Sequence, residues 1–215
     1  METALTDLDH VIIDPRRPLV IVDVDEVLAK FMLGFERFVG RHGYEMRITR
    51  FALFQNIYLR GAEEHVGVEA GVELFNAFFL DGANDLEPAE GAADALADLS
   101  TRAEVVILTN APGHGREARA KWLKRHGFNY PLVVNSGLKG PAAAELSGRT
   151  SGASAFIDDL LPNLESVAES APAVSRFQMV ADERLRPYAP SAPDRHPRHD
   201  EWPALKAAIE AAILR

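Results

Sequence analysis

The stretch PLVIVDVDEVLAKF (residues 18–31) joins an apolar run to an acidic end. Residues 19–22 are all aliphatic and show no alternation of polar and apolar side chains, a pattern that is typical of a strand buried on both faces of a parallel sheet. Asp23 and Asp25 follow this run directly. Since parallel sheets bind ligands outside the carboxyl ends of their strands, the stretch predicts a central strand that ends in a ligand site.

Four further apolar runs follow along the chain: AEVVILTN (103–110), PLVVNSG (131–137), SAFIDD (154–159) and the weaker SRFQMVA (175–181). Helical periodicity is found at residues 88–99, 115–126, 161–170 and 201–214. Strands that alternate with helices predict an α/β fold: a Rossmann-like parallel sheet of about five strands with helices on both faces.

Two segments interrupt this alternation. Residues 31–82 have helical character and no clear strand, which predicts a small helical cap inserted after the first strand. The predicted domains are therefore a core of residues 1–30 and 83–215 and a cap lobe of residues 31–82. Residues 185–203 hold five of the 13 prolines and are expected to form a loop. Its histidines, His196 and His199, match no spacing of metal ligands, so we expect them to be solvated.

Charge and composition exclude several classes of function. The 215 residues carry a net charge of −9, which argues against a nucleic-acid polymer or an anionic membrane as a partner. The absence of cysteine excludes disulfides, zinc–thiolate sites and cysteine nucleophiles. The N-terminus does not resemble a signal peptide and the apolar runs are too short to span a bilayer, so we expect a cytoplasmic protein. A homodimer is left open.

Polar residues at the predicted strand ends carry the candidate chemistry. They are Asp23, Asp25, Thr109, Asn110, Lys139, Asp158 and Asp159. Because the carboxyl ends of parallel strands meet at one edge of a sheet, these side chains are expected to line one crevice. Carboxylates that lie so close raise one another's pKa unless a cation joins them, and an all-oxygen set of ligands suits Mg²⁺. Taken alone, each pattern has a structural alternative, such as a solvated strand end or a helix N-cap.

In their order, these motifs resemble those of the haloacid dehalogenase superfamily. They are VIVDVDEV (20–27), VVILTN (105–110), Lys139 within SGLKGP (136–141), and AFIDD (155–159). A lobe inserted soon after the first motif resembles the helical cap of that superfamily. Within it, DVDEVLAKF (23–31) is most similar to the DxDGVLADF pattern of 5′(3′)-deoxyribonucleotidases, from which it departs at Glu26 and Lys30. FFLDGANDLEPAEGAADAL (78–96) also resembles the segment by which those enzymes leave their cap.

The resemblance implies a Mg²⁺-dependent phosphatase that forms an aspartyl-phosphate on Asp23. Asp25 would act as general acid and base, and its backbone carbonyl would bind the metal. Asp23 and Asp159 would bind Mg²⁺ directly, whereas Asp158 would reach it through water. At the same edge, Thr109 would donate a hydrogen bond to a phosphoryl oxygen.

Lys139 would neutralise both the phosphate and the nucleophile. The implied substrate is a small phosphate ester, and the nucleotidase pattern favours a ribo- or deoxyribonucleoside monophosphate. Phe31 and Asn110 are the candidate substrate contacts, although Phe31 could instead belong to the cap's own core. Two alternatives remain open: a phosphotransferase or mutase on the same fold, and a catalytically silent regulatory module. The motif pattern leaves the role of Glu26 undecided.

Overall fold

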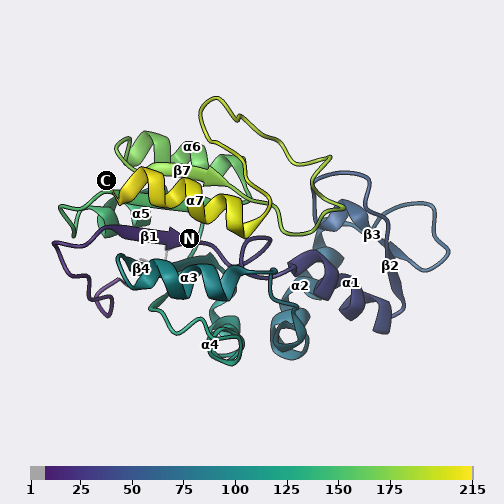
Figure 1. The fold of residues 1–215 in the computed structure, drawn as a ribbon. Helices are drawn as coiled ribbons and strands as arrows, with labels where there is room; N and C mark the ends of the chain where they lie inside the picture. Colours follow the sequence, from purple (N-terminus) through teal and green to yellow (C-terminus); the bar gives the residue numbers. More distant parts are fainter. Residues whose placement is uncertain (1–7, 215) are drawn as a thin grey trace.

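A computed structural model describes residues 8–214, and a sheet of five parallel strands lies at its centre (Figure 1). In spatial order the strands are β5 (Leu132–Asn135), β4 (Glu104–Asn110), β1 (Leu19–Val22), β6 (Ser154–Asp158) and β7 (Ser175–Gln178). Val22 of β1 pairs with Ile107 of β4 and with Ile157 of β6. The register therefore brings the carboxyl ends of three strands side by side, and the predicted fold class is confirmed.

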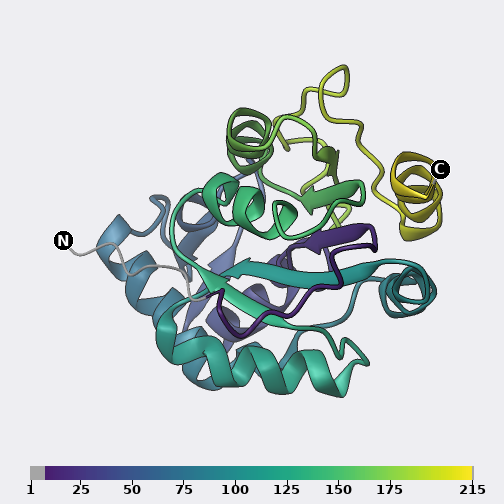
Figure 2. The ribbon, with the colours of Figure 1, turned by 90° about the vertical axis from the view of Figure 1, so that its left-hand side faces the viewer.

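Helices cover both faces of the sheet (Figure 2). The helices α5 (Gly140–Ser147) and α6 (Leu161–Ser170) pack on one face. The other face is covered by α3 (Ala92–Ser100), α4 (Arg116–Arg125) and α7 (Trp202–Ile213). The 3-10 turn η3 (Gly113–Gly115) directly precedes α4. In β1, Leu19 and Ile21 face α5 and α6 while Val20 and Val22 face the opposite layer. Burial of both faces explains the unbroken apolar run. Among residues 8–214, no helix combines the length and the apolar character needed to cross a lipid bilayer.

The cap lies beyond the carboxyl edge of the sheet, at the right of Figure 1. Its elements are α1 (Phe31–Arg41), β2 (Tyr44–Met46), the 3-10 turn η1 (Phe54–Asn56), β3 (Ile57–Leu59), α2 (Val68–Asp81) and the 3-10 turn η2 (Ala83–Asp85). The expectation that this segment holds no strand is wrong, because β2 and β3 form an antiparallel hairpin. Each strand has three residues, which is too short to give a period of two in the sequence. The domain boundaries stay a prediction.

Phenylalanine rings join α1 to α2 inside the cap. The ring centroid of Phe78 lies 5.3 Å from that of Phe31, 5.3 Å from that of Phe35 and 5.5 Å from that of Phe38. All four side chains are buried, and edge-to-face contacts of this kind stabilise a small aromatic core. Phe31 therefore contributes to the cap's own packing, as the structural alternative expected.

The chain between β7 and α7 reaches from the sheet to the cap (Figure 1). Its residues Val180 and Leu185 form a buried apolar cluster with Met32 of α1. The cap residues Phe51 and Leu53 pack against this cluster. The segment predicted as a loop thus holds the cap against the core.

His196, in the same segment, is buried rather than solvated, which corrects the expectation from composition. Its Nε2 lies 3.3 Å from the Glu165 carboxylate, and its Nδ1 accepts a hydrogen bond of 3.3 Å from Arg176 Nε. Burial lowers the pKa of His196 below its ordinary value. The proline-rich segment therefore places His196 against α6 and β7. Its contacts there are with Glu165 and Arg176.

Candidate active site

Lys139 joins the carboxylates that follow β1 and end β6. Its Nζ lies 2.7 Å from Asp23 Oδ1 and 2.7 Å from Asp158 Oδ2, and all three side chains are buried. Thr109, in the neighbouring strand β4, is fully buried, and its hydroxyl has no hydrogen-bond partner among the described residues. The structure therefore brings Asp23, Asp158 and Lys139, predicted from separate motifs, into direct contact.

The loop before Lys139 is held in place by two asparagines. Asn110 Nδ2 donates a hydrogen bond of 2.9 Å to the Gly137 carbonyl, and Asn135 Nδ2 donates one of 2.9 Å to Asn110 Oδ1. Gly137 has a φ of +82°, in the left-handed region that favours glycine, so the turn needs glycine there. The contacts of Asn110 thus support the lysine loop, and its predicted contact with substrate stays a prediction.

Three carboxylates form a candidate metal centre. One oxygen each of Asp23, Asp158 and Asp159 lies within 4.8 Å of the others, and all three residues are buried. Asp158 already accepts hydrogen bonds from Leu160 N at 2.9 Å and from Asn163 Nδ2 at 3.0 Å, whereas no hydrogen bond to the Asp159 side chain occurs within residues 8–214. A set of carboxylate oxygens fits Mg²⁺, which prefers oxygen ligands, and Asp159 is more available to it than Asp158.

Burial and like charge shift the pKa of these groups. Burial raises the pKa of Asp158 to about 6, although the charge of Lys139 opposes the shift. Burial, together with the charge of Asp158, raises the pKa of Asp159 well above its ordinary value. Burial by itself would lower the pKa of Lys139, but the carboxylates of Asp158 and Asp23 raise it above the usual value. A divalent cation would relieve the repulsion that these acids share.

Asp25 has a buried partner that the motif analysis missed. Arg119 of α4 is 1% exposed and its Nη2 donates a hydrogen bond of 2.7 Å to Asp25 Oδ2. Its guanidinium carbon lies 5.2 Å from the ring centroid of Phe79 in the cap. Burial raises the pKa of Asp25 above its ordinary value, against the opposing charge of Arg119. Arg119 lies on the buried face of α4 together with Trp122 and Leu123, which follow it at i+3 and i+4. A charged residue on an otherwise apolar helix face was the sequence signal that could have identified Arg119.

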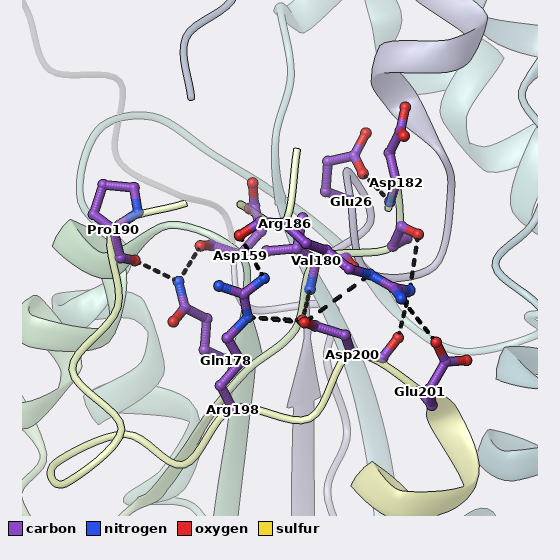
Figure 3. Close-up of polar contacts among 11 residues, drawn as sticks. Glu26, Asp159, Gln178, Val180, Asp182, Arg186, Pro190, Arg198, Asp200 and Glu201 are labelled. Atoms are coloured by element: carbon purple, nitrogen blue, oxygen red, sulfur yellow. Dashed lines mark hydrogen bonds and ion pairs between the residues drawn. The ribbon is translucent and has the colours of Figure 1, made fainter. Parts of the chain in front are cut away.

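Glu26, whose role the motif pattern left undecided, is buried and points away from solvent. Its Oε1 accepts a hydrogen bond of 2.7 Å from Met32 N. Its Oε2 accepts one of 2.8 Å from Asp182 N (Figure 3). Burial raises its pKa to about 7. Its φ is +57°, a left-handed conformation that costs a side-chain-bearing residue about 1–2 kcal/mol. Glu26 thus ties the first turn of the cap to the loop after β7.

A second set of hydrogen bonds anchors that loop beside the acidic cluster (Figure 3). Gln178 Nε2 donates hydrogen bonds to the carbonyls of Asp159 at 2.9 Å and of Pro190 at 2.8 Å. Arg186 Nε donates one of 2.9 Å to the Val180 carbonyl. The buried amide of Gln178 and the half-buried guanidinium of Arg186 therefore fix the loop backbone next to the candidate metal centre.

A cavity of about 200 Å³ lies between cap and core, next to the acidic cluster. Its lining residues come from both parts: Asp25, Glu26, Phe31, Met32, Phe51, Ala52, Leu53, Asp159, Leu160 and Leu185. The predicted substrate contact Phe31 lies in this wall, although it is also part of the aromatic core of the cap. The cavity thus presents mainly apolar side chains beside the carboxylates of the sheet edge.

Comparisons with known proteins agree with the architecture. No family model and no curated protein matches the chain. Several solved structures do, among them a haloacid dehalogenase-like family hydrolase of Streptococcus pneumoniae, with a TM-score of 0.57 and 14% identity over 90% of this chain and 99% of that one. A HAD-superfamily hydrolase of subfamily IA from Geobacter sulfurreducens has a TM-score of 0.55 and 15% identity over 90% of this chain and 96% of that one.

YfnB of Bacillus subtilis, described as bound to magnesium, matches with a TM-score of 0.57 and 12% identity over 90% of this chain and 99% of that one. Identities this low show a shared fold and nothing finer. The chain therefore has the haloacid dehalogenase-like fold, and its chemistry must be argued from its own residues.

Proposed function

We propose that this protein is a Mg²⁺-dependent hydrolase of phosphate monoesters that uses Asp23 as its nucleophile. The observation that carries the proposal is the contact of Lys139 with Asp23 and Asp158 beside Asp159, at the carboxyl edge of a haloacid dehalogenase-like sheet. The motif order and the magnesium bound to YfnB of Bacillus subtilis support the same chemistry. The substrate is a small phosphate ester.

In the first step, the Asp23 carboxylate attacks phosphorus, and the bond from phosphorus to the alcohol oxygen breaks. Asp25 gives its proton to that oxygen, so the alcohol leaves neutral. In the second step, Asp25 takes a proton from water as the water oxygen attacks phosphorus and the bond to Asp23 breaks. Inorganic phosphate leaves, and both carboxyl groups return to their starting states.

The contacts of Asp25 support its part in this sequence. Arg119 holds Oδ2, whereas Oδ1 is buried without a hydrogen-bond partner among the described residues. One oxygen is therefore anchored while the other is available to exchange a proton with the substrate. Proton transfer by a positioned carboxyl group contributes about 10²–10⁴-fold to rate in enzymes of this kind.

The buried hydroxyl of Thr109 supports a role in holding the phosphoryl group, since it lacks any other partner within the described residues. Lys139 would neutralise charge on the phosphoryl oxygens and on Asp23. Mg²⁺ would be held by Asp23, Asp159 and the Asp25 carbonyl, with Asp158 expected to reach it through water, and would supply further positive charge at these oxygens.

A nucleoside monophosphate is the finer form of the proposal. It rests on the resemblance of residues 23–31 to the nucleotidase pattern and on Phe31 in the cavity wall, where a ring could stack on a base. A phosphotransferase would share the first step and pass the phosphoryl group to an alcohol instead of water. A silent regulatory module would keep the fold without turnover.

Phosphate release from a panel of phosphomonoesters, nucleotides included, tests the proposal. Release should need Mg²⁺, stop with EDTA and vanish in Asp23→Asn. Near-normal release by purified Asp23→Asn would reject the nucleophile, and release that survives EDTA would reject the metal. Less than one phosphate per ester consumed would favour a phosphotransferase, and no consumption by the folded protein would favour a regulatory module.

A further inference from the structure

The cavity between cap and core opens on the acidic edge of the sheet, because Asp25 and Asp159 form part of its wall. If the proposed function holds, the phosphoryl group lies at Asp23 and the rest of the ester extends past Asp25, the residue that gives a proton to the leaving oxygen. The cavity is then the place of the leaving group, and its lining describes the alcohol that fits there.

Apolar side chains from three separate segments build most of this wall. Phe31 and Met32 come from the first turn of α1, Phe51 and Leu53 from the cap loop before η1, and Leu185 from the loop after β7. Met32 and Leu185 also pack against each other in a buried cluster, so the wall is part of the contact between cap and core. A substrate group that fills the cavity would contact mainly the carbon atoms of these apolar side chains, and such burial favours apolar groups.

The charged groups in the lining are already engaged. Both oxygens of Glu26 accept backbone N–H groups, Asp25 is paired with Arg119, and Asp159 belongs to the candidate metal centre. Among the described residues, none of those that line the cavity is a lysine, an arginine or a histidine. An anionic substituent would find no counter-ion in the lining, and a cationic one would meet only carboxylates that are held by Arg119, by backbone N–H groups or, once the metal binds, by Mg²⁺.

We propose that the substrate is a phosphate ester of an uncharged, largely apolar alcohol, in preference to the nucleoside monophosphate that the motif resemblance favours, because a nucleoside is larger and more polar than this cavity accommodates. Transfer of a charged substituent from water into this cavity would be unfavourable, because nothing in the lining replaces the lost hydration. The cavity volume of about 200 Å³ lies below the usual range for ligand pockets, which is roughly 300–1,000 Å³, so the alcohol is also small. Esters that carry a carboxylate, an ammonium group or a second phosphate are rejected by the same wall.

Steady-state hydrolysis of four esters tests this proposal: benzyl phosphate, glycerol 3-phosphate, 3-phosphoglycerate and phosphoethanolamine. All four leave as alkyl alcohols, so the comparison reports the substituent rather than the acidity of the leaving group. Benzyl phosphate should have a kcat/KM at least about tenfold above each of the others, since a tenfold change corresponds to about 1.4 kcal/mol. A charged ester, or the polar glycerol ester, that equals or exceeds benzyl phosphate would overturn the proposal.

A charge introduced into the wall gives a second test. Leu53→Arg should lower kcat/KM for benzyl phosphate and raise it for 3-phosphoglycerate, each by about tenfold, because the new guanidinium supplies the missing counter-ion. Leu59→Arg is the matched control, since Leu59 lies in the same lobe, is 56% exposed and is absent from the cavity lining. The proposal would be contradicted if the ratio of kcat/KM for benzyl phosphate to kcat/KM for 3-phosphoglycerate were the same in both variants. If Leu53→Arg does not fold, the ranking of esters by the unaltered protein decides.

Binding measurements separate this inference from the proposed function. Benzylphosphonate, phosphonoacetate and 2-aminoethylphosphonate carry the same three kinds of substituent on a bond that is not hydrolysed. Calorimetric titration into the protein with Mg²⁺ should give the lowest Kd for benzylphosphonate even if no ester is turned over, an outcome that would reject the hydrolase but keep the cavity assignment. Tighter binding of either charged phosphonate would reject the cavity assignment, whatever the catalytic activity.

Discussion

The two sides of the cavity differ in what holds them together. On the core side, Asp23, Asp158 and Lys139 are buried charges joined by contacts of 2.7 Å, and the pairing of β1 with β6 aligns the two carboxylates. On the cap side, Phe51 and Leu53 come from a loop and meet the core through apolar packing alone. Buried charges tolerate little displacement, whereas apolar contacts can be exchanged with small changes in free energy. We therefore expect the chemistry to take place at the sheet edge and the cap to select the substrate.

We expect the largest loss of activity when the proposed nucleophile on the core side is replaced. Asp23→Asn keeps the size of the side chain but removes the attacking carboxylate, so phosphate release should fall by at least about 10³-fold. Single-turnover assays with the esters above measure the loss, and circular dichroism checks that the fold is retained. Activity within tenfold of the unaltered protein would assign the nucleophile elsewhere.

Removal of the buried ammonium group tests whether the core side depends on charge pairing. Lys139→Met leaves Asp23 and Asp158 without their shared cation, which should lower the free energy of unfolding by about 3–5 kcal/mol without metal. Urea unfolding in EDTA measures this difference. Lys121→Met is the control, because its ion pair with Glu117 is exposed and should contribute less than about 1 kcal/mol. Similar losses in both variants would argue against the pairing.

The contact between cap and core should respond to pH through Glu26. Its folded pKa of about 7 exceeds its ordinary value of 4.5, so the folded protein binds more protons than the unfolded chain between these values. The stability that protonated Glu26 contributes is thus present below about pH 4.5 and lost as pH rises through about 7. The shift corresponds to about 3 kcal/mol.

Glu26→Gln should flatten this dependence, because glutamine does not titrate. Urea unfolding in EDTA at several pH values between 4.5 and 7.5 compares the variant with the unaltered protein. Asp25, Asp158 and Asp159, whose pKa values are also raised, titrate in both proteins. Because burial and, to a lesser extent, the charge of Glu26 raise the pKa of Asp159, the difference reports Glu26 together with its coupling to Asp159. Parallel stability curves would show that Glu26 does not carry the predicted linkage.

Arg119 lies where core and cap meet, and its loss should have the smallest of these effects. Arg119→Met frees Asp25 Oδ2 and removes the guanidinium beside Phe79, so kcat should fall by about 10–100-fold with little change in KM. A positioning role predicts partial rescue by Arg119→Lys, which restores the charge but not the planar geometry. A rise in KM with unchanged kcat would instead place Arg119 in substrate binding.

Local patterns were enough for most of the fold. Each strand of the sheet has its own apolar run, and α6 spans the residues predicted for it, 161–170. The helix α5 was not predicted, because GPAAAELS has eight mostly small residues and little periodic contrast. The hairpin of β2 and β3 was also missed, since its three-residue strands are stabilised by pairing with each other rather than by a pattern within either one.

The sequence by itself determined which groups stand at the edge of the sheet. Asp23 directly follows β1, Thr109 lies near the end of β4 and Asp158 ends β6, and the carboxyl ends of neighbouring parallel strands have to meet. Only the tertiary structure decided that Arg119 reaches Asp25, that Glu26 turns inward, and that Leu53 and Leu185 share one wall. These contacts join segments far apart in the chain, and their geometry depends on how whole elements pack, which no local periodicity encodes.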